Sequence, residues 1–132
     1  MKKLLLLLPL LLASPAYAKA APCVVTPDPV SLSADSTFTV TATGLPNVLY
    51  EVTDQQTHHH KTDEARVWLG YADDAGNISA VIDVIDGRTT NVREAMWPGD
   101  VSVKVLRWKA GGGTSSGSGA VLLTTCGFTV IE

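Results

Sequence analysis

Cysteine, aromatic residues and charged residues are all scarce in this sequence of 132 residues. It contains two cysteines, 6% aromatic residues and 17% charged residues, against 45% hydrophobic residues. Such a composition excludes a chain that is disordered because it has too little to bury. If the two cysteines pair with each other, no thiol remains for a catalytic nucleophile or for a zinc–thiolate site.

A second long hydrophobic run is also missing. The run Leu4–Ala13 is about half of the ~20 residues that a membrane span needs. Lys2 and Lys3 precede it, and Ala16-Tyr17-Ala18 follows it as an A-x-A cleavage site. This is the pattern of a secretory signal peptide. We therefore predict a signal peptide over 1–18 and one exported domain over 19–132, periplasmic or extracellular, with no membrane span after processing.

The exported part lacks an excess of basic residues. Removing Lys2 and Lys3 leaves eight basic residues against thirteen acidic ones, a formal charge of −5. A nucleic-acid-binding domain needs a basic face to neutralise phosphates. The charge balance therefore predicts that nucleic acid is not a partner.

A helical period is absent over long stretches, whereas alternation of apolar and polar residues recurs. Turn signals such as Gly44-Leu45-Pro46-Asn47 separate these stretches at intervals of 8–12 residues. The pattern predicts an all-β fold, a sandwich or a small barrel of about seven antiparallel strands. The alternation assigns twelve side chains to its core: Phe38, Val40, Val48, Tyr50, Val52, Val67, Leu69, Ile82, Val84, Val103, Val105 and Phe128.

Three segments together resemble the immunoglobulin-like domains of secreted bacterial and phage proteins. They are a strand with a Gly-Leu-Pro turn, a D-x-x-G-x hairpin and a P-G-x-φ-x-φ strand entry, where φ is apolar: 38–46, 73–77 and 97–103. The similarity extends over about Val30–Ile131 and implies an immunoglobulin-like sandwich, without implying an activity. The sequence departs from antibody-type domains, in which a disulfide joins two central strands and a tryptophan packs on it.

The two cysteines lie near opposite ends of the exported chain. An oxidising compartment favours pairing of Cys23 with Cys126. Two buried free thiols, or lipid modification of Cys23, are the alternatives. The predicted disulfide would close almost the whole domain into one loop.

Three consecutive histidines lie in the segment 54–64, which we predict to be a polar loop. Imidazole binds zinc, copper and nickel. If the segment is extended, His58 and His60 share a face and are candidate metal ligands. A solvated loop without a specific metal site is the alternative, and we predict no cofactor.

Two tryptophans are out of phase with the apolar residues of their strands. Trp68 and Trp108 alternate against the predicted core positions, and Trp97 lies in a loop. With Arg66, placed on the face of Trp68, they are candidate residues for binding a protein or a glycan surface. Tryptophans at the edge of the core are the alternative.

Motifs of hydrolases and phosphate-binding loops are missing: G-x-S-x-G, H-E-x-x-H and a glycine-rich loop before a helix. The sequence therefore predicts a secreted, non-catalytic binding or structural module, associated with a phage or with the cell envelope. Two other functions stay open, a small secreted metal-binding protein and a secreted enzyme with a dispersed active site.

Overall fold

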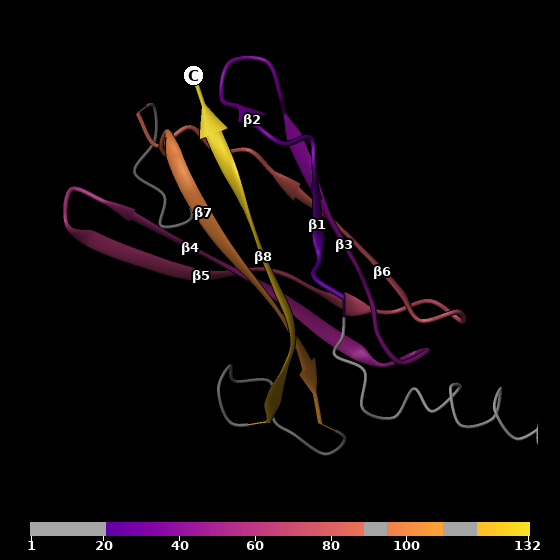
Figure 1. The fold of residues 1–132 in the computed structure, drawn as a ribbon. Helices are drawn as coiled ribbons and strands as arrows, with labels where there is room; N and C mark the ends of the chain where they lie inside the picture. Colours follow the sequence, from indigo (N-terminus) through magenta and orange to yellow (C-terminus); the bar gives the residue numbers. More distant parts are fainter. Residues whose placement is uncertain (1–20, 89–94, 110–118) are drawn as a thin grey trace, which may run out of the picture.

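The protein is all-β in the computed structural model, which describes residues 21–88, 95–109 and 119–132. Eight strands are present in this part of the chain (Figure 1): β1 Val24–Thr26, β2 Val30–Ser31, β3 Thr37–Thr43, β4 Leu49–His58, β5 Lys61–Tyr71, β6 Asn77–Asp83, β7 Gly99–Trp108 and β8 Ala120–Ile131. These residues contain no helix that could cross a membrane. The predicted signal peptide lies outside the described residues.

The strands form two sheets that pack against each other as in a β-sandwich. The small sheet has three strands in the order β1-β3-β6, and the large sheet has five in the order β2-β8-β7-β4-β5. We call the side of each sheet that is turned toward the other sheet its inner face, and the opposite side its outer face. The chain enters on the first sheet with β1 and crosses to the second with β2.

One strand pair corrects the expectation of a purely antiparallel fold. Strand β2 runs parallel to β8, with Val30 opposite Val130 and Ser31 opposite Ile131. The crossing between β1 and β2 contains Pro27 and Pro29, whose rings fix φ and supply no N–H for ladder pairing. The N-terminal segment therefore leaves its antiparallel partner β3 and continues along the last strand.

The core lies between the inner faces and follows the predicted alternation on most strands. The rings of Phe38 in β3 and Phe128 in β8 meet between the sheets, with centroids 5.0 Å apart. Eight predicted core residues are buried: Phe38, Val40, Tyr50, Val52, Ile82, Val103, Val105 and Phe128. Val48, Val67 and Val84 are partly buried and pack against them. Leu69 was assigned wrongly to the core, because 43% of its surface is exposed.

A bulge in β5 explains the error at Leu69. Val52 lies opposite Trp68 whereas Thr53 lies opposite Arg66, so Val67 is the extra residue. An extra residue reverses the side on which the following side chains lie. Trp68 therefore turns to the inner face, and Leu69 turns to the outer face.

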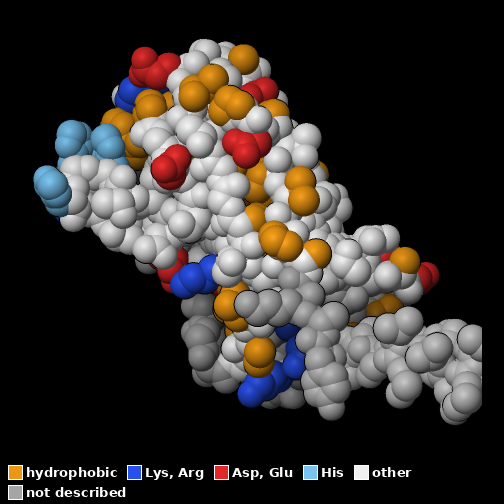
Figure 2. All heavy atoms as spheres, viewed as in Figure 1, with side chains coloured by type: hydrophobic (Ala, Val, Ile, Leu, Met, Phe, Trp, Pro, Cys, Tyr) orange, Lys and Arg blue, Asp and Glu red, His pale blue; other side chains and the backbone are white. Residues whose placement is uncertain are grey.

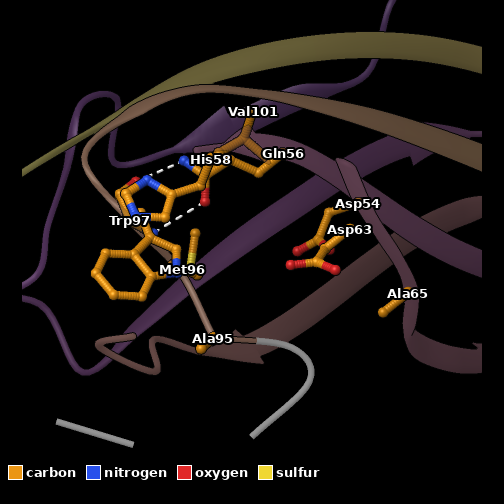
Figure 3. Close-up of a pocket in the computed structure, with 9 residues that line it drawn as sticks. All are labelled: Asp54, Gln56, His58, Asp63, Ala65, Ala95, Met96, Trp97 and Val101. Carbon is orange, nitrogen blue, oxygen red and sulfur yellow. Dashed lines mark hydrogen bonds between the residues drawn. The ribbon is translucent and has the colours of Figure 1, made fainter. Parts of the chain in front are cut away.

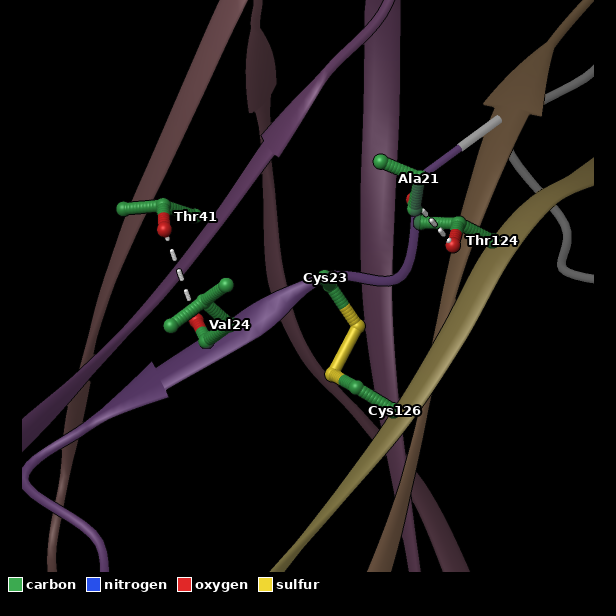
Figure 4. Close-up of a disulfide and its surroundings, with 6 residues drawn as sticks. All are labelled: Ala21, Cys23, Val24, Thr41, Thr124 and Cys126. Atoms are coloured by element: carbon green, nitrogen blue, oxygen red, sulfur yellow. Dashed lines mark hydrogen bonds between the residues drawn. A yellow bond between two sulfur atoms is a disulfide. The ribbon is translucent and has the colours of Figure 1, made fainter. Parts of the chain in front are cut away.

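The predicted disulfide between Cys23 and Cys126 is confirmed, and Figure 4 shows it. The Cα atoms are 5.2 Å apart at a sequence separation of 103. Next to it, the Thr124 hydroxyl donates a hydrogen bond of 2.8 Å to the Ala21 carbonyl. The bridge joins Cys23, which immediately precedes β1 of the small sheet, to Cys126 in β8 of the large sheet. An intramolecular disulfide is consistent with an exported protein.

The predicted turn after β5 is confirmed in detail. The Asp73 carboxylate accepts hydrogen bonds from the N–H groups of Ala75, at 2.9 Å, and Asn77, at 2.8 Å. These bonds lower the pKa of Asp73 from its ordinary value of 3.8. Gly76 has a φ of 85°, as the turn requires.

The segment 54–64 is a regular hairpin, which corrects the prediction of a loop. Strands β4 and β5 pair from one end to the other, and His58 lies opposite Lys61. The connecting residues His59 and His60 have φ values of 50° and 64°, the pattern of a type I′ turn. Backbone pairing with β5 and β7 forms the strand although its side chains are polar. The hairpin extends away from the small sheet (Figure 1).

Candidate functional site

The four predicted partner-binding residues do not form one surface. Trp68 lies on the inner face of the large sheet, is partly buried and packs against the core. Its ring covers Gly70, where a Cβ atom would lie 2.5 Å from it. Arg66 is exposed on the outer face, because the bulge at Val67 separates the two residues. The prediction that Trp68 and Arg66 share a face is therefore wrong.

Trp108 lies on the outer face, out of phase with the valines of β7 as predicted. Its ring is nevertheless buried, with only 5% of its surface exposed. The indole Nε1 donates a hydrogen bond of 3.1 Å to Oε1 of Glu51, which is also buried. The Thr53 hydroxyl donates a second bond, of 2.7 Å, to Oε2 of the same carboxyl group. Trp108 is thus held by a buried polar network and offers no free ring.

Exposed apolar side chains gather on the outer face around this network. Strand pairing places Leu69 opposite Glu51, Glu51 opposite Leu106, and Leu106 opposite Leu122, which makes one row across four strands. Leu69 is 43% exposed, Leu122 is 53% exposed and Tyr71, the next outward residue of β5, is 70% exposed. We call the following residues the apolar half-face, in which Leu106 is half-buried and Trp108 is buried: Leu69, Tyr71, Leu106, Trp108 and Leu122.

The other half of the same outer face is polar. Near the hairpin, the hydroxyl groups of Thr57 and Thr62 lie 3.0 Å apart across β4 and β5. The Lys104 ammonium forms an exposed ion pair of 3.4 Å with Glu64. The outer face is therefore divided between apolar and polar residues along the strands. Contiguous exposed apolar residues with a polar border are typical of interaction surfaces.

Trp97 lies on the inner face of the large sheet, near the hairpin between β4 and β5. Figure 3 shows it beside a shallow cleft. The Gln56 side-chain amide bonds both the N–H of Trp97, at 2.9 Å, and its carbonyl, at 2.5 Å. The His58 ring stacks on the indole at a centroid distance of 4.0 Å and an angle of 10°. Gly87 also lies against the indole, since a Cβ atom there would approach it to 2.6 Å. Trp97 is therefore engaged by its own chain.

The predicted metal ligands His58 and His60 have different surroundings. The histidines cluster at the hairpin end in Figure 2, but His60 is exposed in the turn while the His58 ring is stacked on Trp97. His58 Nε2 is buried and has no hydrogen-bond partner. Burial and the charge of His59 lower the pKa of His58, against an opposing effect of Asp63. Within 21–88, 95–109 and 119–132, no three His, Cys, Asp or Glu residues are placed to hold a metal ion.

Comparison with protein-family models and with curated proteins finds no match to this chain. The arrangement of its side chains is therefore the basis for assigning a function. The apolar half-face is the candidate site that the strand register reveals. The sequence signal for it was the outward phase of Trp108, whereas the bulge at Val67 concealed the exposure of Leu69 and Tyr71.

Proposed function

We propose that this protein is an exported, non-catalytic module of the immunoglobulin-like class that contacts a protein partner through its apolar half-face. The intramolecular disulfide supports export. Two sheets of orders β1-β3-β6 and β2-β8-β7-β4-β5, with the N-terminal segment divided between them, support the immunoglobulin-like class.

The row of Leu69, Leu106 and Leu122 across the outer face carries this proposal. An exposed leucine alone is ordinary on a protein surface, but three leucines in one row on β5, β7 and β8, with the buried Glu51 of β4 between Leu69 and Leu106 and with Tyr71 next along β5, are not. The cores of protein interfaces combine such apolar side chains with tyrosine and have few charged groups. The polar half with Lys104 and Glu64 supplies one border of the contact.

A protein partner fits this surface better than a glycan. Sugar rings stack on flat aromatic faces that are open to solvent. The tryptophans are occupied, because Trp68 packs on the core, Trp97 lies against His58 and Gly87, and Trp108 is buried on Glu51. Among the half-face residues, Tyr71 is the one aromatic ring open to solvent, and the other exposed side chains, Leu69 and Leu122, are aliphatic. Aliphatic leucine side chains, in contrast, provide the hydrophobic contact area that a protein surface can cover.

The experiment compares two pairs of substitutions on opposite sheets. Leu69→Ser with Tyr71→Ser removes apolar groups from the half-face. Val24→Ser with Val81→Ser is the matched control, because these valines are 57% and 60% exposed on the outer face of the small sheet. Capture of an envelope protein by the immobilised wild-type protein, followed by measurement of the affinity for that purified protein, provides the readout.

We expect the half-face variant to bind the captured protein about tenfold or more weakly, and the control variant to bind like the wild type. Truncating central apolar contacts typically costs 1–2 kcal/mol or more of binding energy, whereas exposed residues outside the contact cost little. Equal affinity of the two variants would contradict the proposal. Both variants are checked by circular dichroism, since their substituted side chains are exposed.

A further inference from the structure

A second candidate site lies at the end of the sandwich opposite Trp97. A groove of about 410 Å³ runs between the turn after β3 and the beginning of β8. Its volume is in the range of small-molecule sites, which is about 300–1,000 Å³. Half of its lining residues are leucine or valine, and none of the described lining residues is acidic: Thr43, Gly44, Leu45, Tyr50, Arg107, Val121, Leu122 and Leu123.

Arg107 places one positive charge in this apolar lining. It is half-buried on the inner face of β7, where strand pairing puts it opposite Tyr50 on one side and Val121 on the other. Within the described residues, no carboxylate lies at ion-pair distance from its guanidinium group. A guanidinium group that is partly removed from water gains most from an anion, and a carboxylate matches its paired N–H donors.

The backbone at the groove offers little to a peptide. The N–H of Gly44 is bonded to the carbonyl of Gly76 at 2.8 Å, and the N–H of Leu45 is bonded to the Tyr50 hydroxyl oxygen at 2.7 Å. A peptide that binds as an added strand pairs with free main-chain groups. What the groove offers is aliphatic wall from Leu45, Val121 and Leu123, together with the charge of Arg107.

We propose that this groove binds a small aliphatic carboxylate, with the carboxylate on Arg107 and the hydrocarbon chain against the leucine and valine side chains. The ligand differs from the protein partner, and the groove shares one lining residue, Leu122, with the half-face. Leu122 borders both places and is left unchanged in the tests. The proposal does not depend on the protein partner, because the groove variants leave Leu69 and Tyr71 intact.

Calorimetric titration of the disulfide-bonded protein with sodium octanoate and with 1-octanol tests the charge. The two probes share a hydrocarbon chain and differ in the carboxylate. We expect octanoate to bind about tenfold or more tightly than octanol, since the carboxylate forms a charged hydrogen-bonded pair with Arg107 that the hydroxyl group of octanol does not form. Absence of octanoate binding up to millimolar concentration, or equal affinity for both probes, would overturn the proposal.

Two variants test the position of the ligand. Arg107→Met keeps the length of the side chain without its charge and should abolish the preference for octanoate, whereas Lys104→Met on the outer face should retain it. Val121→Trp fills the groove and should lower the affinity for both probes about tenfold or more. If Arg107→Met retains the preference, or if Val121→Trp binds both probes like the wild type, the ligand is not in this groove. The comparison of the two probes on the wild-type protein remains decisive if a variant does not fold.

Discussion

The indole nitrogen of Trp108 donates a hydrogen bond of 3.1 Å to the buried carboxyl group of Glu51 on the outer face of the large sheet. Both residues have side chains that point away from the core between the sheets. A buried carboxyl group is stable only where its oxygens have donors. Trp108 and Thr53 supply one donor for each oxygen, so the centre of the half-face is a fixed part of the fold.

Trp108→Phe should destabilise the protein by about 1–3 kcal/mol, because it leaves one oxygen of Glu51 buried without its donor. Thr53→Val should have an effect of similar size on the other oxygen. Thr57→Val is the matched control, since Thr57 is exposed on the same strand and should change stability by less than about 0.5 kcal/mol. Urea unfolding followed by tryptophan fluorescence measures the free energy of unfolding of each of the three variants. If Trp108→Phe has the same free energy of unfolding as the wild type, this hydrogen bond has no structural role.

Removal of the disulfide should have a large effect on stability. Cys23→Ser with Cys126→Ser opens a loop with a sequence separation of 103, for which the chain-entropy model gives about 4–5 kcal/mol. Guanidinium unfolding of the double variant, compared with the oxidised wild type, checks this value. Reduced wild-type protein serves as the control and should unfold like the variant. A midpoint equal to that of the oxidised wild type would contradict the prediction.

Two apolar residues predicted to be in the core should differ in their effects. Phe38→Ala should cost about 3–5 kcal/mol, because the Phe38 ring is buried against Phe128. Leu69→Ala should cost less than about 1 kcal/mol, because Leu69 is exposed beyond the bulge. Thermal unfolding of the two single variants measures the difference. Equal losses would place Leu69 in the core and contradict the strand register.

The stability of the hairpin end should decrease in mild acid. Burial and the charge of His59 lower the pKa of His58 below 6.5, so the folded state favours the neutral imidazole. The unfolded chain then binds the proton more readily, and the stability present above pH 6.5 is lost as the pH falls through 6.5 toward the folded pKa. Protonation would also place a charge on the buried Nε2, which has no acceptor.

Melting temperatures at pH 7.5 and pH 5.5 measure this effect. The His58→Phe variant keeps an aromatic ring for stacking on Trp97 and should lose less stability between the two pH values than the wild type. His60→Asn is the control, because it removes an exposed imidazole at a left-handed position that asparagine tolerates. If His60→Asn rather than His58→Phe reduces the pH dependence, the effect arises from the turn and not from the stack.

Local chemistry made part of the structure predictable from sequence. In β3, Phe38 and Val40 alternate with threonines. Such alternation follows from burial of one face of the sheet, because successive side chains of a strand point to opposite faces. The Asp73 turn uses side-chain bonds to residues two and four positions later, so it needs no distant partner. The disulfide followed from having two cysteines and a predicted export signal, and the structure shows that the chain brings them together.

The candidate sites depended on contacts that no local pattern contains. The extra residue Val67 reverses the orientation of Leu69 and Tyr71, and it is defined only by pairing with β4. The buried Trp108 has its hydrogen-bond partner in Glu51, which is 57 residues away in the chain. The sequence by itself determined the alternation, the turns and the available cysteine pair, because these depend on neighbouring residues. Tertiary structure alone decided which outward-facing side chains are covered and which remain exposed, because register and burial depend on strands that are distant in the chain.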